Sequence, residues 1–127
     1  MYIIYNFLVL CVCCLFVLPY FLYRCICEAG FTTRMRQSLG GLRDEEIASV
    51  AQKDCIWIHG ASVGEIVATS PLVKEIRKAY PDSPILVSAV TVGGYNMAKQ
   101  IIQEADAIIY FPLDMPFVSE SFVKRIQ

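Results

Sequence analysis

The chain opens with a long apolar run and then changes to short apolar runs that alternate with amphipathic stretches. Residues 3–23 carry no charged side chain, and only Asn6 and Pro19 interrupt the apolar run. A helix of that length rises about 31 Å, which matches the hydrocarbon thickness of a lipid bilayer. The pattern therefore predicts one membrane-spanning helix, and we assign residues 1–24 to it.

Residues 54–127 follow the second pattern. Strands are predicted at 55–58, 85–90 and 107–110, and helices at 63–80, 94–105 and 117–126. Pro71 either bends the first of these helices or begins a second one that Ser70 caps. Continuous apolar strands are typical of a parallel sheet covered on both faces. The sequence thus predicts an α/β fold, the first part of a Rossmann-like domain, with fewer strands than such sheets usually have.

The polar segment 25–53 is expected to be a basic juxtamembrane linker. Arg24, Arg34, Arg36 and Arg43 follow the apolar run, and no basic residue precedes it. By the positive-inside rule, the N-terminus lies outside and the chain after the span is cytoplasmic. We interpret the arginines as positive-inside residues, with contact to lipid phosphates as the alternative. The acidic residues 44–46 are expected to form the solvated first turn of a short helix.

Composition excludes several classes of protein. The net charge of −1 provides no basic field for binding nucleic acid. Metal binding is not expected, because the chain has a single histidine and its cysteines lack the spacing of zinc ligands. A cleaved signal peptide would need a basic start and a small-residue cleavage site, which are absent here. The apolar run is therefore interpreted as an uncleaved anchor.

Three predicted loops follow the carboxyl ends of the strands, at residues 59–65, 90–95 and 111–116. In open α/β sheets, ligands bind in the crevice beyond these strand ends. The glycine spacing of the first loop matches neither a P-loop nor a dinucleotide-binding fingerprint. Any ligand chemistry must therefore come from individual side chains in these loops.

The tetrapeptide Ser62-Val63-Gly64-Glu65 in the first loop has two interpretations. Its spacing favours a capping box, with Ser62 as N-cap and Glu65 three residues later. Its position favours chemistry, because a carboxylate at this edge can reach a substrate hydroxyl and act as a general base. Gly64 would let a ligand approach closely, and the helix N-terminus favours an ionised carboxylate.

Four other residues of the domain carry weaker expectations. His59 is a candidate base or anion contact, although a lone histidine at a strand end is more often structural. Asp114 is expected to form a turn with its own backbone. Trp57 and Tyr80 are expected to lie in the core.

Three segments together resemble the N-terminal part of bacterial transferases of 3-deoxy-D-manno-octulosonic acid (Kdo). The segments are Trp57–Glu65 (WIHGASVGE), Pro71–Val73 (PLV) and Tyr110–Pro116 (YFPLDMP). Members of that family are membrane-anchored enzymes of lipopolysaccharide biosynthesis. The order of anchor, short basic segment and α/β domain also agrees with the family, so the resemblance covers essentially the whole chain.

The resemblance implies a glycosyltransferase of the GT-B type, with two facing Rossmann-like domains. Such an enzyme transfers Kdo from CMP-Kdo to a hydroxyl of a lipid A precursor, inverts the anomeric centre and requires no metal or other cofactor. It would lie in the inner membrane with a single span and a cytoplasmic catalytic domain. By this resemblance Glu65 is the general base, Ser62 and Gly64 shape the acceptor site, and His59 is a weaker substrate contact.

The chain departs from the family pattern in two places. Residues 91–94, Thr-Val-Gly-Gly, stand where the family often has a Thr-Pro-Thr-Gly-like turn, so acceptor contacts of that turn do not carry over. The sequence also stops before the donor-binding domain, so we expect a truncated chain that does not catalyse transfer alone. The alternatives are a non-catalytic membrane-anchored module and another GT-B transferase that acts on a lipid-linked acceptor.

Overall fold

The computed structural model describes residues 2–28 and 30–126 and divides the chain into two compact units. The N-terminal unit comprises Met1–Thr32, and the α/β unit comprises Thr33–Gln127. The two units are described separately below.

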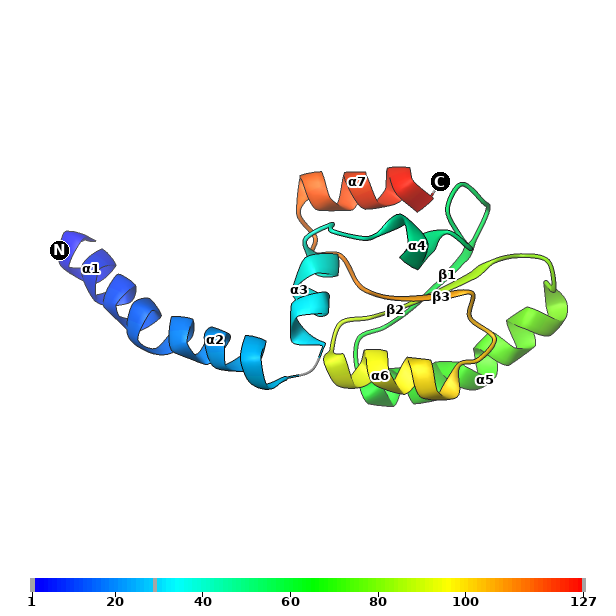
Figure 1. Ribbon diagram of the computed structural model, residues 1–127, viewed down its shortest axis with the longest axis horizontal. Coiled ribbons are helices and arrows are strands. Elements are labelled where there is room, and N and C mark those ends of the chain that lie inside the picture. The colour runs from blue at the N-terminus through cyan, green and yellow to red at the C-terminus, as the bar shows by residue number, and fades with distance from the viewer. Residues whose placement is uncertain (1, 29, 127) are drawn as a thin grey trace. The chain divides into compact units, whose positions relative to one another are not determined.

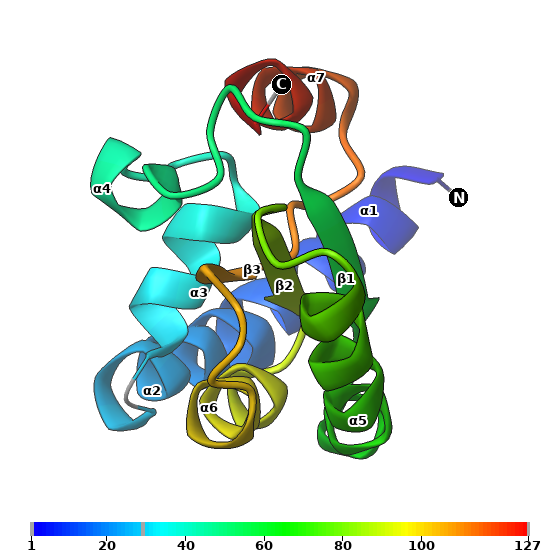
Figure 2. The same cartoon turned by 90° about the vertical axis from the view of Figure 1, so that its right-hand side faces the viewer.

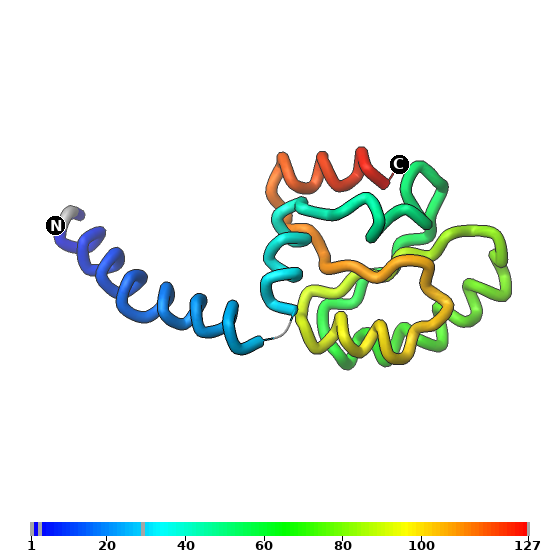
Figure 3. Tube along the Cα trace, in the orientation of Figure 1, coloured from blue at the N-terminus to red at the C-terminus, as the bar shows by residue number. Residues whose placement is uncertain are grey.

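Residues 2–27 of the N-terminal unit form a continuous helical run (Figure 3). Its elements are α1 (Tyr2–Val12), the π-helical turn η1 (Cys13–Val17) and α2 (Leu18–Cys27). Pro19 has no N–H to donate to the preceding turn, and the widened π-helical turn lies immediately before it. Residues 4–27 are long and apolar enough to cross a membrane, a property that signal sequences share.

The α/β unit contains a three-stranded parallel sheet in the order β1-β2-β3. In chain order its elements are α3 (Phe31–Ser38), which begins just before the unit, α4 (Asp44–Ile47), β1 (Ile56–Gly60), α5 (Val63–Ala79), β2 (Ile85–Ala89), α6 (Val92–Ile101), β3 (Ala107–Tyr110) and α7 (Pro116–Ile126). The predicted α/β class and the parallel arrangement of the strands are confirmed.

Helices cover both faces of the sheet, as Figures 1 and 2 show. On one face, α5 and α6 lie side by side, and their Ile66, Val73 and Ala98 pack against Val87 of the central strand. On the other face, residues from α4 and α7 pack against β2 and β3; this core comprises Leu42, Ile47, Val50, Leu86, Ala107, Ile109, Phe122 and Ile126. Burial on both faces explains why β2 and β3 are almost entirely apolar.

Helix α3 is part of the cover over β3. The Gln37 side chain is buried, and its Oε1 accepts a hydrogen bond from the Tyr110 backbone N–H at 2.8 Å. Ser38 Oγ donates to the Phe111 carbonyl at 3.0 Å. Together with the core residue Leu42, these contacts bring part of the segment expected to be a linker, residues 25–53, into the compact unit.

Two local expectations need correction, and of the two alternatives for Pro71 the single helix is found. Helix α6 spans Val92–Ile101 instead of 94–105, because Thr91 caps it by accepting the Gly94 N–H at 3.0 Å. Helix α5 runs through Pro71 as one helix of 17 residues. The expectation that Trp57 and Tyr80 are core residues is wrong, since they are 39% and 57% exposed. Trp57 lies on the edge strand β1, and Tyr80 follows the last turn of α5.

Candidate functional site

The three loops at the carboxyl end of the sheet meet through backbone contacts and one ring contact. The Thr91 N–H and hydroxyl both donate to the Ala61 carbonyl, at 3.2 and 3.3 Å, and this joins the first loop to the second. The Phe111 N–H donates to the Ala89 carbonyl at 2.9 Å, and the Phe111 ring lies 4.3 Å from the His59 ring. The first and third loops therefore also touch.

Ser62 and Glu65 begin α5, but they do not form the capping box that their spacing predicts. Ser62 is the N-cap residue, yet its side chain makes no capping hydrogen bond. Glu65 Oε2 instead accepts the N–H of Ala61 at 2.6 Å, one residue before the N-cap. This bond ties the carboxylate to the strand end, while Oε1 has no hydrogen-bond partner among the described residues.

The surroundings of two glycines show where this edge is packed and where it is open. A Cβ on Gly60, the last residue of β1, would lie 2.9 Å from Cδ1 of the buried Ile66. A Cβ on Gly64 would have no neighbouring atom within 4 Å. Gly60 thus serves the close approach of β1 and α5, whereas the space beside Gly64 and Glu65 is open.

His59 is the last residue but one of β1. Its ring Nδ1 is 3.0 Å from Ser88 Oγ on the neighbouring strand, and Trp57 Nε1 is 2.8 Å from the same oxygen. The strand register brings His59 directly opposite Ser88. Sequence reasoning missed Ser88 because it lies in an apolar strand; a single polar residue in a fully buried strand was the available signal.

The acidic and basic residues of α3 and α4 form contacts inside the unit. Arg36 pairs with Glu46 at 2.5 Å, and Arg125 pairs with Asp44 at 2.5 Å. Burial opposes ionisation of Glu46, but Arg36 and the Arg43 N–H outweigh it and lower the pKa of that carboxyl. The acidic turn therefore links α4 to α3 and α7 as well as facing solvent.

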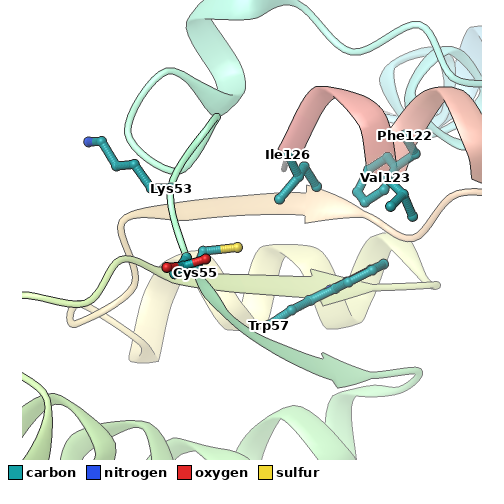
Figure 4. A pocket seen from close by; sticks show the side chains of 7 residues that line it. Lys53, Cys55, Trp57, Phe122, Val123 and Ile126 are labelled. Atoms are coloured by element: carbon teal, nitrogen blue, oxygen red, sulfur yellow. The ribbon is translucent and has the colours of Figure 1, made fainter.

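A pocket of about 500 Å³ lies at the opposite, amino-terminal end of β1 (Figure 4). Trp57, Cys55 and Lys53 line it from the strand side, and Phe122 and Val123 line it from α7. Burial raises the pKa of the Cys55 thiol, which disfavours the reactive thiolate. Over the described part of the chain, no three His, Cys, Asp or Glu side chains are grouped as a metal site would require.

Fold and site together define the class of the protein. It is a Rossmann-like α/β protein in which a carboxylate, an imidazole and two helix N-termini lie at the carboxyl edge of a parallel sheet. The family model described as 3-deoxy-D-manno-octulosonic-acid transferase (Kdo transferase) matches residues 33–127. The chain belongs to this family, as the resemblance in its sequence indicates.

Individual relatives agree with the family assignment. The chain is 35% identical to a 3-deoxy-D-manno-octulosonic acid transferase of Haemophilus influenzae over 80 residues, 63% of this chain and 19% of the relative. It is 29% identical to the enzyme of the same name from Chlamydophila psittaci over 86% of this chain and 25% of the relative. A third, from Rickettsia felis, is 29% identical over 78% of this chain and 22% of its own length.

The chain therefore spans about a fifth to a quarter of the length of these relatives. No solved structure matches it significantly.

Proposed function

We propose that this chain forms the acceptor-binding part of a membrane-anchored glycosyltransferase that transfers Kdo from CMP-Kdo to a lipid A precursor, with Glu65 as the general base. Family membership supports the reaction and the substrates. The observation that carries the role of Glu65 is its half-occupied carboxylate. One oxygen is held by the Ala61 N–H, and the other is free beside the open space at Gly64.

In this reaction an acceptor hydroxyl lies against the free oxygen of Glu65. The hydroxyl oxygen attacks the anomeric carbon of Kdo while Glu65 takes its proton. The bond from that carbon to the phosphate oxygen breaks, and CMP leaves with the electron pair. Negative charge is favourable at a helix N-terminus, which suits a carboxylate that must be ionised to act. The CMP moiety would be bound mostly by residues outside this chain, and no metal ion is invoked.

Ser62, Gly64 and His59 complete the proposed acceptor site. Gly64 leaves room for a sugar ring next to the carboxylate, and the exposed Ser62 hydroxyl has no intramolecular capping bond to lose. His59 provides a second polar group at the same edge. The site is assigned to the acceptor because the resemblance to the family implies acceptor binding by the N-terminal domain, which residues 33–127 match.

The test uses a chimera in which residues 33–127 replace the matching segment of the Haemophilus influenzae relative, assayed for Kdo transfer to a lipid A precursor. Glu65→Gln keeps a carbonyl to accept the Ala61 N–H but removes the base. We expect it to lower kcat by about 10²–10⁴-fold. Glu75→Gln, on the exposed surface of the same helix, is the matched control. Transfer by the Glu65→Gln chimera at the unmodified rate would contradict the assignment.

The helical run of the N-terminal unit supports an anchor that is retained in the inner membrane, with the α/β unit in the cytoplasm. None of the side chains in its most apolar stretch of 18 residues is buried, as expected for a surface that contacts lipid. The expected result is a membrane-bound chain that resists alkaline extraction and whose N-terminal peptide is found by mass spectrometry. Loss of residues 1–24 from the mature protein would instead identify a signal sequence.

A further inference from the structure

A buried serine connects the only tryptophan and the only histidine of the chain. Ser88 Oγ lies 2.8 Å from Trp57 Nε1 and 3.0 Å from His59 Nδ1. Trp57 and His59 project on the same face of β1 because they are two residues apart, and the register places Ser88 opposite His59. Ser88 is 0% exposed, so its hydroxyl depends on these two neighbours.

One direction of the hydrogen bonds among the three groups satisfies every donor. An indole N–H can only donate, so Trp57 occupies a lone pair of the Ser88 oxygen. Within residues 2–28 and 30–126, Ser88 Oγ has no partner besides Trp57 and His59. The Ser88 oxygen has a second lone pair, but if it accepted from His59 as well, its own buried hydrogen would have no acceptor among these residues. Donation of that hydrogen to His59 Nδ1 satisfies all three groups. A neutral imidazole that accepts at Nδ1 carries its own hydrogen on Nε2.

We propose that Trp57 and Ser88 are positioning residues that hold His59 as the Nε2–H tautomer, and that this N–H donates to an oxygen of the acceptor sugar. The proposal rests on the function proposed above. His59 is exposed, and its Nε2 has no hydrogen-bond partner in the described part of the chain. The Phe111 ring, 4.3 Å from the imidazole, restricts ring rotation.

His59 and Glu65 lie at the same end of β1, where the strand leads into α5. His59 precedes Ala61 by two residues, and the Ala61 N–H holds the Glu65 carboxylate at 2.6 Å. Two residues of extended chain separate the Cα atoms of His59 and Ala61 by about 7 Å. In the proposed complex a sugar at this strand end meets Glu65 through one hydroxyl and His59 through another oxygen. The imidazole donor would fix the orientation of the sugar, while Glu65 takes the proton.

The tautomer can be measured directly because the chain has one histidine. The full chain, made without a histidine tag and with ¹⁵N-labelled histidine, is examined by NMR in detergent micelles at an alkaline pH where free imidazole is neutral. The ring nitrogen shifts should show an excess of the Nε2–H form over the urea-unfolded chain. A folded chain with mainly Nδ1–H, or with the unfolded ratio, would overturn the proposal.

Three variants test the cause of the tautomer. Ser88→Ala should return the ratio toward the unfolded value. Trp57→Phe keeps an aromatic ring but removes the donor that orients the Ser88 hydroxyl toward His59, so the Nδ1–H form should increase. Ser49→Ala removes a hydroxyl that bonds the Asp106 carbonyl, at the amino-terminal side of β3, and should change nothing. An unchanged ratio in both Ser88→Ala and Trp57→Phe would contradict a positioning role.

Two amide substitutions of His59 test the donor itself, in the chimera described above. Gln places its amide nitrogen near the position of Nε2, whereas Asn places it near Nδ1. His59→Asn should raise the KM for the lipid acceptor about five- to tenfold with a smaller change in kcat, and His59→Gln should recover most of that loss. Equal KM values for the two variants would refute the donor role. Glu65→Gln lowers kcat instead, so failure of the base and failure of the donor are distinguishable.

Discussion

The two ends of the sheet use polar side chains in opposite ways. At the amino-terminal end, the Arg77 guanidinium donates to the carbonyls of Glu104, Pro81 and Ser83 and pairs with Asp106 at 2.5 Å. Asp106 also accepts the Ile85 N–H at 2.7 Å. Arg77 and Asp106 are thus each engaged several times over.

At the carboxyl end, the polar groups are only half engaged. Glu65 uses one carboxylate oxygen, and His59 uses one ring nitrogen. A side chain whose hydrogen bonds are all internal contributes to stability. An unused donor or acceptor at an exposed edge of the sheet is available to a ligand. The comparison predicts that variants at the first end change stability and that variants at the second end change transfer.

The largest expected effect on stability is at Arg77. Arg77→Met keeps the aliphatic stem and removes every donor, which leaves three carbonyls and a partly buried carboxylate without this partner. We expect a loss of about 3 kcal/mol in the free energy of unfolding. The measurement is urea unfolding followed by fluorescence of Trp57, the single tryptophan, which lies in the α/β unit.

Two controls sharpen the Arg77 experiment. Arg77→Lys keeps the charge but cannot reach all the acceptors at once, so it should recover part of the loss. The free energy of unfolding of Glu65→Gln should lie within about 0.5 kcal/mol of that of the unmodified chain, as expected for exposed sites. If Glu65→Gln destabilised the chain as much as Arg77→Met, the division between the two ends would fail.

The next effect contrasts two glycines of the same loop. Gly60→Ala would push a methyl group against Ile66 in the core and should lower the free energy of unfolding by about 1–2 kcal/mol. Gly64→Ala meets no neighbour and lies in the first turn of α5, so stability should be unchanged or rise by about 0.5 kcal/mol. In the chimera, however, Gly64→Ala should raise the acceptor KM. Unaltered acceptor kinetics in Gly64→Ala would show that the open space is not occupied by substrate.

The sequence predicts the sheet well because the relevant signal is local. The strands at 85–90 and 107–110 are found within one residue of their predicted bounds, since short apolar runs between turns identify buried strands. The place of Glu65 at the sheet edge follows from the same pattern. The hydrogen bond of Glu65 differs from the predicted capping box. Its carboxylate accepts the Ala61 N–H instead of the N–H of Ser62, the N-cap residue.

Contacts between distant segments could not be predicted in this way. Gln37 meets the Tyr110 N–H across 73 positions of sequence, and no local pattern in residues 25–53 indicates that pairing. Trp57 is apolar by composition, but its exposure follows from the edge position of β1, which depends on strand order. The pairing of His59 with Ser88 likewise depends on register between strands.

The smallest effect is a pH dependence at Asp106. Burial opposes ionisation of this carboxyl, but the Ile85 N–H and Arg77 outweigh it and lower its pKa. A carboxyl with a lowered pKa in the folded state adds stability above its ordinary pKa and loses it as the pH falls toward the lowered value. Because the side chain is 37% exposed, solvent screening limits the expected cost of Asp106→Asn to about 1 kcal/mol at pH 7.

That cost should shrink once the pH falls below about 4, where the carboxyl in the unfolded chain is protonated. The measurement is urea unfolding of the unmodified chain and of Asp106→Asn at neutral pH and near pH 3. Asp82→Asn, in the exposed turn before β2, is the matched control and should differ little from the unmodified chain at either pH. A cost for Asp106→Asn that stayed constant with pH would mean that Arg77 is held mainly by its three carbonyl acceptors. The hydrogen bonds from Arg77 to backbone carbonyls would then stabilise the amino-terminal end, and the ion pair with Asp106 would contribute little.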